Sequence, residues 1–256
     1  MRAIAVIPAR MASSRFPGKP MALIHGMPMI GHCYCRVRLC EALEDTYVAT
    51  CDREIYKYIE SVGGKAIMTA NTHERASDRA AEAMVQIEEV TDEKTDILVM
   101  VQGDEPMDTP EMITEALAPM MYDEAVQVVN LMGRIDSETE FEDPNNVKVV
   151  VGPDSNAIYF SREPVPSRKK SIEDVTMLKQ ICVIPFRRDY LLEFNKTPET
   201  PLERIESVDM LRVIESGGAV RMVMTDYPSV SVDTPRDLEV VKDLMISDSL
   251  MREYLD

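Results

Sequence analysis

The sequence lacks several features that define large classes of protein. No apolar run approaches the length of a membrane span and there is no signal peptide, so neither a membrane protein nor a secreted one is expected. The five cysteines are odd in number and lack paired zinc spacing, which predicts reduced thiols in a cytoplasmic protein. Tryptophan, internal repeats and low-complexity segments are also absent.

Positive charge is scarce as well. The chain has 28 Lys and Arg but 45 Asp and Glu, which gives a formal net charge of −17. This acidity argues against nucleic acid as a partner, because a phosphate backbone would be repelled. It also makes any local basic cluster more informative. The 256 residues are enough for one large α/β domain, and a single domain spanning 1–256 is predicted.

A basic cluster does occur, directly after the first predicted strand. Residues 3–7 form an apolar run rich in Ile and Val, typical of a buried parallel strand. The loop that follows is built of small residues and holds Arg10, Arg15 and Lys19. Its backbone N–H groups and cations can cradle a polyphosphate at the carboxyl end of the strand. Neither common phosphate-loop motif is present, and a solvated loop with incidental cations is the alternative.

Helix and strand patterns alternate after this loop. The predicted helices are 29–43, 53–62, 77–90 and 109–121, and the predicted strands are 46–50, 66–68 and 97–101. This succession predicts an α/β fold with a doubly wound, mostly parallel sheet.

The pattern changes after about residue 125. Predicted strands 125–131, 147–151, 157–160 and 181–186 have no long helices between them; two helices, a strand over 220–225 and a helix from 235 follow. A small β-rich arm, roughly within 132–190, is therefore predicted. The polar segment 163–177 is expected to form a mobile loop.

Two carboxylates stand at the ends of predicted strands. Asp104 follows the apolar strand 97–101 in the sequence Gln-Gly-Asp-Glu-Pro, and Asp233 ends a β-rich stretch just before Thr234 and a helix. Mg²⁺ usually takes one or two protein carboxylates plus phosphate oxygens. If both residues lie at the same sheet edge, they can form a two-carboxylate metal site. The alternatives are an ordinary acidic turn at Asp104 and a helix N-cap at Asp233 or Thr234.

The order of residues 7–20, I-P-A-R-x-x-S-S-R-x-P-G-K-P, resembles the opening signature of sugar-activating cytidylyltransferases. The most similar family is the 3-deoxy-manno-octulosonate (Kdo) cytidylyltransferases, with the sialic-acid enzymes more distant. V-Q-G-D-E-P and V-D-T-P are also motifs of that family. The resemblance implies a Rossmann-like nucleotidyltransferase fold, transfer of CMP from CTP to an acidic acceptor with release of pyrophosphate, and Mg²⁺ as cofactor. It also implies a homodimer packed through the β-rich arm.

The resemblance further implies which residues bind CTP and metal. Lys19 and Arg10, together with Arg15, would hold the triphosphate and stabilise the leaving group, and Asp104 and Asp233 would hold the metal. The residues assigned to CTP are Pro8, Ala9, Arg10, Ser14, Arg15, Lys19, His73, Ala76, Ser77, Arg79, Gln102 and Gly103. The segment 68–82 resembles the family loop that surrounds cytosine, except that S-G-T-E is replaced at 75–78.

The acceptor side departs from the family. Residues 159–162 match Y-F-S-R, whose Arg faces the acceptor carboxylate, so Arg162 is assigned there; residues 145–149 resemble a further motif, N-P-N-x-V-K-V. The other positions assigned to the acceptor are Gln102, Gln180, Ile184, Asp209 and Met210. The last four replace a His, a Tyr, a Glu and a Gln of the Kdo enzymes.

These replacements affect the expected acceptor. A site that hydrogen-bonds a substrate hydroxyl discriminates strongly, so the acceptor is expected to differ from Kdo in its distal part, with Kdo a poor substrate. The leading class is a 3-deoxy-2-ulosonic acid sugar, and another small acid such as a phosphonate is the alternative. A nucleotide-binding module without catalysis is a third hypothesis, which the presence of both Asp104 and Asp233 disfavours.

Overall fold

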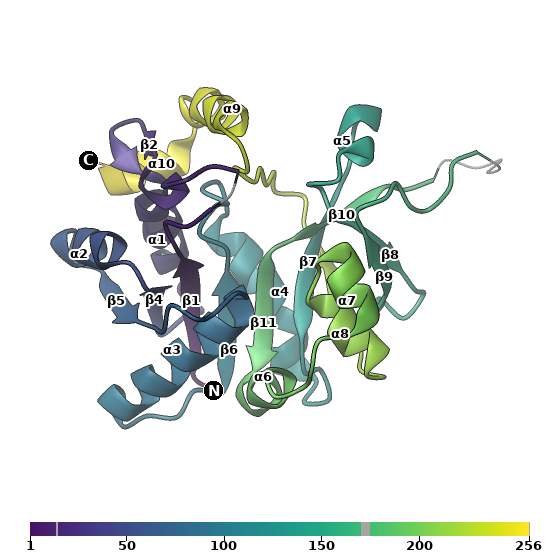
Figure 1. Ribbon diagram of the computed structural model, residues 1–256, viewed down its shortest axis with the longest axis horizontal. Helices are drawn as coiled ribbons and strands as arrows, with labels where there is room; N and C mark the ends of the chain where they lie inside the picture. The colour runs from purple at the N-terminus through teal and green to yellow at the C-terminus, as the bar shows by residue number, and fades with distance from the viewer. Residues whose placement is uncertain (14, 170–174, 256) are drawn as a thin grey trace.

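Two five-stranded sheets organise the chain in the computed structural model, which describes residues 1–13, 15–169 and 175–255 (Figure 1). The first sheet has the order β11-β6-β1-β4-β5. Its strands are β1 (Ala3–Ala9), β4 (Asp45–Thr50), β5 (Lys65–Met68), β6 (Ile97–Val101) and β11 (Val183–Arg187). β1 pairs in parallel with β4 and β6, and β4 pairs in parallel with β5; β11 is antiparallel to β6 at the edge.

Helices cover both faces of this sheet, because its central strand is apolar on both faces. Ile4 and Val6 enter one core cluster, while Ala5 and Ile7 enter another. The first cluster includes residues of α3 (Ala76–Thr91) and α6 (Arg188–Phe194). The second includes residues of α1 (Met29–Arg38), α2 (Arg53–Ser61) and α4 (Pro110–Tyr122). The prediction of a doubly wound, mostly parallel sheet is confirmed.

The second sheet has the order β12-β7-β10-β8-β9 and lies beside the first (Figure 1). Its strands are β7 (Val129–Arg134), β8 (Lys148–Val151), β9 (Ala157–Ser161), β10 (Leu178–Ile181) and β12 (Arg221–Met224). β7 and β12 are parallel, and the other pairs are antiparallel. The short helices nearby are α5 (Glu138–Glu142), α7 (Pro201–Glu206) and α8 (Met210–Glu215). This sheet therefore draws on strands beyond the predicted range 132–190.

The predicted strand 181–186 is two strands, broken at Cys182. β10 belongs to the second sheet and β11 to the first, so the chain crosses between the sheets at this residue. The Cys182 carbonyl accepts from the N–H of Gln102 (3.3 Å), and its N–H donates to Glu105 Oε1 (3.4 Å). The crossing therefore lies against the loop after β6.

One further expectation needs adjustment, and one concerns a segment of which only part is described. The helix predicted over 29–43 ends at Arg38, where the chain turns through Leu39. In the segment predicted as a mobile loop, residues 163–169 and 175–177 form no helix or strand, and 170–174 lie outside the described residues.

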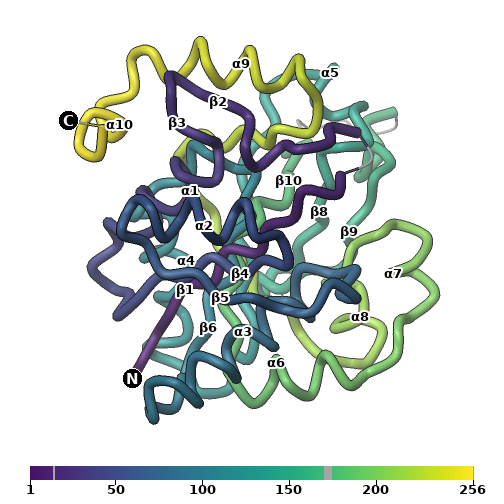
Figure 2. The backbone as a smooth tube through the Cα atoms, turned by 60° about the vertical axis from the view of Figure 1, so that its left-hand side comes forward, coloured from purple at the N-terminus to yellow at the C-terminus, as the bar shows by residue number. Residues whose placement is uncertain are grey.

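The C-terminal helices pack against the segment that follows the first loop. This segment contains a short 3₁₀ helix, η1 (Lys19–Met21), and the hairpin of β2 (Leu23–Ile24) and β3 (Met27–Pro28); the helices are α9 (Pro235–Met245) and α10 (Ser249–Leu255). Figure 2 shows the hairpin beneath α9. Ile24, Leu238 and Val241 share a third apolar cluster. Within the described part of the chain, no helix is long and apolar enough to cross a membrane.

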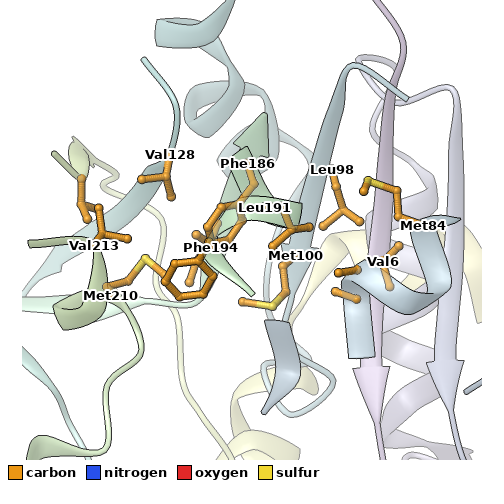
Figure 3. Packing of buried hydrophobic residues seen from close by; sticks show 14 of the residues in the cluster. Val6, Met84, Leu98, Met100, Val128, Phe186, Leu191, Phe194, Met210 and Val213 are labelled. Carbon is orange, nitrogen blue, oxygen red and sulfur yellow. The ribbon is translucent and has the colours of Figure 1, made fainter. Parts of the chain in front are cut away.

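Phe186 tests the packing at the junction of the sheets (Figure 3). Its side chain is fully buried and lies 5.8 Å, between ring centroids, from Phe194. Phe186→Ala leaves a cavity, so the free energy of unfolding is expected to fall by about 3–5 kcal/mol in denaturant titrations. Tyr122→Ala is the control, because Tyr122 is 91% exposed, and should change it by less than about 0.5 kcal/mol. Equal effects of the two substitutions would contradict the packing described.

Candidate active site

Residues 10–19, which we call the basic loop, leave the carboxyl end of β1 and fold back on Met11. The Met11 N–H donates to Asp52 Oδ2 (2.8 Å), which ties the loop to the end of β4. The Met11 carbonyl accepts from the N–H groups of Ser13 and Gly18, both at 3.0 Å. Gly18 has φ +75°, a left-handed conformation that other residues rarely adopt. Sequence reasoning missed Asp52, because nothing local connects it to the loop.

The basic loop forms one wall of a cleft of about 670 Å³. The cleft is lined by Pro8, Ala9, Arg10, Ala12, Ser13, Arg15, Lys19, Pro20, His73, Glu74, Arg75, Ala76, Arg79, Gln102, Gly103 and Asp104. Gly103 allows the ends of β1 and β6 to approach, since a Cβ there would lie 3.1 Å from the Pro8 carbonyl oxygen. Five cations against two acids make this cleft basic in an acidic protein, as an anionic ligand requires.

Most residues predicted to bind CTP line this one cleft. They are Pro8, Ala9, Arg10, Arg15, Lys19, His73, Ala76, Arg79, Gln102 and Gly103. Ser14 lies outside the described residues. Ser77 is fully buried and is not among the residues that line the cleft, so its assignment to CTP stays a prediction. Arg75 and Glu74 line the cleft without having been predicted, although their neighbours in the sequence were.

The wall opposite the basic loop, formed by residues 73–76 and 79, is held in place by hydrogen bonds. The buried Arg79 guanidinium donates to Thr69 Oγ1 and to the carbonyls of Ala70 (3.2 Å) and His73 (3.4 Å). Glu82 accepts from the Ala70 N–H (3.0 Å) and pairs with His73 Nε2. Burial alone would raise the pKa of Glu82, but the hydrogen bonds from Ala70 and His73 outweigh burial and lower it. Arg79 and Glu82 thus fix this wall.

Arg75 connects the same wall to α7. Its Nη2 lies 2.5 Å from Glu199 Oε1, and its Nε lies 3.1 Å from Glu203 Oε1. Glu203 is fully buried and also takes two hydrogen bonds from Arg212, at 2.6 and 2.8 Å. The wall and the helices beside the second sheet are therefore joined by paired charges.

Asp104 and Asp233 lie on either side of one ammonium group. Lys19 Nζ is 2.5 Å from Asp104 Oδ2 and 3.7 Å from Asp233 Oδ1. The Val232 N–H donates to the Asp104 carbonyl (2.9 Å), so the two motif segments run side by side. Thr234, whose Oγ1 accepts from the Asp237 N–H, caps α9. The Asp233 carboxylate therefore faces the cleft cations.

This pair has the donor set that a hard divalent cation prefers. Burial raises the pKa of Asp233, and the Lys19 ammonium only partly offsets it. Among the described residues no cluster of three or more metal-ligating His, Cys, Asp or Glu occurs, so substrate oxygens or water molecules would have to complete the coordination of a cation.

A second acidic pair lies behind Asp104. Ser229 Oγ donates to Glu105 Oε2 (2.9 Å) and lies 3.3 Å from Asp108 Oδ1. Burial, together with the neighbouring Asp104 charge, raises the pKa of Glu105 to about 6. Sequence reasoning missed this cluster, because Ser229, its third member, lies more than 100 residues from the two acids.

The residues assigned to the acceptor are only partly brought together. Gln102 lines the cleft. Gln180 Nε2 donates to Asn130 Oδ1 (2.6 Å), and Asp209 is half-buried, which raises its pKa. Ile184 and Met210 are 1% and 0% exposed and belong to the hydrophobic core, where Met210 lies beside Phe194 (Figure 3). This corrects the expectation that these two side chains contact an acceptor.

Arg162 lies outside the lining of the cleft. Its Nε donates to the Glu206 carbonyl (2.6 Å), its Nη1 to the Pro144 carbonyl (2.8 Å) and its Nη2 to the Ser207 carbonyl (3.3 Å). These bonds hold the second sheet to α7. A contact between Arg162 and the acceptor stays a prediction.

A cationic cleft at the carboxyl ends of parallel strands, with a carboxylate pair beside it, characterises a nucleotidyltransferase. The family model described as cytidylyltransferase matches residues 4–248. The Kdo cytidylyltransferase of Geobacter metallireducens is 40% identical over 251 residues, which is 94% of this chain and 96% of that protein. The corresponding protein of Syntrophus aciditrophicus is 40% identical over 95% of this chain and 97% of its own length. The chain therefore belongs to the cytidylyltransferase family and is a CTP-dependent nucleotidyltransferase.

Solved structures agree with this assignment. A CMP:2-keto-3-deoxy-manno-octonic acid synthetase complexed with CTP has a TM-score of 0.87 and 39% identity; the match covers 96% of this chain and 99% of that one. A cytidylyltransferase from Leptospira borgpetersenii has a TM-score of 0.64 at 14% identity, covering 97% and 88%, and shows the fold alone.

Proposed function

We propose that the protein transfers CMP from CTP to Kdo and releases pyrophosphate, with Mg²⁺ as its cofactor. The observation that carries this proposal is the convergence of Asp104 and Asp233 on Lys19 at the edge of a cationic cleft. The cations of this cleft can bind a triphosphate, and the two carboxylates at its edge can bind the accompanying metal ion.

In this reaction a hydroxyl oxygen of the acceptor bonds to the α-phosphorus of CTP, while the bond from that phosphorus to the bridging oxygen breaks. The protein positions the reactants and neutralises charge. Arg10, Arg15 and Lys19 line the cleft from the basic loop and would neutralise the phosphates of CTP. Asp104 and Asp233 would hold Mg²⁺, which would further neutralise the phosphate oxygens.

Kdo is favoured as acceptor by two lines of argument. Relatives named for Kdo are 40% identical over nearly the whole chain. In addition, Ile184 and Met210 lie in the core and are not among the residues that line the cleft, so two of the four replacements stand outside it. The earlier expectation that Kdo is a poor substrate thereby loses half of its basis. Arg162 Nη1 and Nη2 each carry a second N–H group, which can donate a hydrogen bond to an acceptor carboxylate.

The assembly and location belong to the same proposal. We propose one domain over residues 1–256 that acts as a cytoplasmic homodimer, with the second sheet in the interface. β9 is an edge strand of that sheet, and its Ile158 is 57% exposed. All five cysteines are free, which suits a reducing compartment.

The substrate assignment is tested by pyrophosphate release with purified protein and Mg²⁺. CTP with Kdo should give a kcat/KM of about 10⁴ M⁻¹s⁻¹ or more, and ATP, GTP and UTP should be far poorer. Other ulosonic acids and phosphonates form the acceptor panel. Faster turnover of a phosphonate would replace Kdo by the alternative acid. CTP binding without turnover of any acid would favour a module without catalysis.

The metal assignment is tested by Asp104→Asn and Asp233→Asn. Each substitution keeps the shape but removes a charged ligand, so kcat should fall by about 100-fold or more. The free energy of unfolding should change by only about 1 kcal/mol, since both side chains are partly exposed. Asp226→Asn, at an exposed position, is the matched control and should retain wild-type turnover. Normal turnover in either active-site variant would show that its carboxylate is only a structural turn residue.

A further inference from the structure

The turn at residues 143–146 lies between the basic loop and Arg162. It is closed by its own first residue, since Asp143 Oδ1 accepts from the Asn145 N–H (2.8 Å) and the Asp143 carbonyl accepts from the Asn146 N–H (3.2 Å). The side chain of Asn145 is exposed and takes no part in closing the turn.

Lys148 holds the back of this turn. Its side chain is fully buried, and its Nζ donates to the carbonyls of Asp143 (2.9 Å), Asn146 (2.7 Å) and Arg162 (2.6 Å). Because an ammonium group has three donors, these bonds use all of them. Arg162 Nη1 also donates to the Pro144 carbonyl (2.8 Å). The turn is therefore fixed to the end of β9.

The front of the turn meets the basic loop through one guanidinium. Arg15 Nη1 donates to Asn145 Oδ1, while Arg15 Nη2 donates to Asp233 Oδ1 (2.9 Å). A planar guanidinium held at both Nη atoms has a fixed orientation. Since the Arg15 side chain is about half exposed, little besides these two bonds restrains it.

We propose that Asn145 is a positioning residue, which holds the Arg15 guanidinium at the phosphate end of the cleft and joins the basic loop to the second sheet. The proposal rests on the proposed role of this cleft as the triphosphate site. The proposal gives a function to the motif at 145–149. Lys148 fixes the turn, and Asn145 supplies the side-chain oxygen to which Arg15 donates its hydrogen bond.

The chemistry of the amide explains why an asparagine suits this position. Its carbonyl oxygen accepts a hydrogen bond without carrying charge, so it orients Arg15 and adds no negative charge to that of Asp233. An aspartate would accept the same bond but would place a second carboxylate on Arg15 and repel the triphosphate.

Calorimetric titration of CTP with Mg²⁺, without any acceptor, tests the proposal. Asn145→Ala should raise the Kd of CTP about tenfold, the scale of one hydrogen bond to a charged group. Asn145→Asp should raise it further. Arg15→Ala combined with Asn145→Ala should bind no more weakly than Arg15→Ala alone, because Asn145 acts through Arg15. Asn146→Ala is the control within the same turn, since its side chain contacts the Glu140 carbonyl instead.

Wild-type affinity in Asn145→Ala would overturn the proposal. So would additive effects in the double variant, because they would mean that Asn145 does not act through Arg15. An equal loss in Asn146→Ala would also overturn it, because the effect would then belong to the whole turn and not to the Asn145 amide. Thermal unfolding of each variant shows whether it is folded under the conditions of the titration. Failure of the Kdo assay with intact CTP binding would contradict only the proposed acceptor.

Discussion

Two carboxylates that the backbone forces together need a cation between them. The hydrogen bond from the Val232 N–H to the Asp104 carbonyl, 2.9 Å long, fixes the loop after β6 beside the segment before α9. Asp104 and Asp233 then repel each other in a partly buried place, where charges interact more strongly than in water. The Lys19 ammonium relieves this repulsion, at 2.5 and 3.7 Å from the two carboxylates. The basic loop that carries Lys19 is held over the cleft by the same contacts.

The surrounding structure supports this cluster from three sides. Asp52 holds the start of the basic loop to the end of β4, and Gly103 lets β6 approach β1 closely. The chain crosses between the sheets at Cys182, directly against Gln102 and Glu105. The second sheet is thereby attached to the loop after β6, which carries Asp104. The two sheets consequently meet at a hydrogen-bonded crossing of the chain beside the cleft.

Some of this was predictable from the sequence, and the reasons differ between elements. A strand covered on both faces must be an uninterrupted apolar run, so residues 3–7 and 97–101 predicted the central strands correctly. The break at Cys182 was not predictable, because an apolar run looks the same whether it serves one sheet or two. Motif positions identified Ile184 and Met210 but not the direction of their side chains, which the packing of the folded chain sets. The Glu105–Asp108–Ser229 cluster depends on a distant segment and left no local pattern.

The central claim is that a divalent cation takes the position that Lys19 now holds between the carboxylates. Anomalous diffraction from crystals grown with CTP and Mn²⁺, as a substitute for Mg²⁺, tests it directly. The account predicts one strong peak within about 2.0–2.6 Å of oxygens from both Asp104 and Asp233, with Lys19 Nζ moved to the phosphates. A peak away from these carboxylates, with Lys19 still bridging them while CTP is bound, would contradict it.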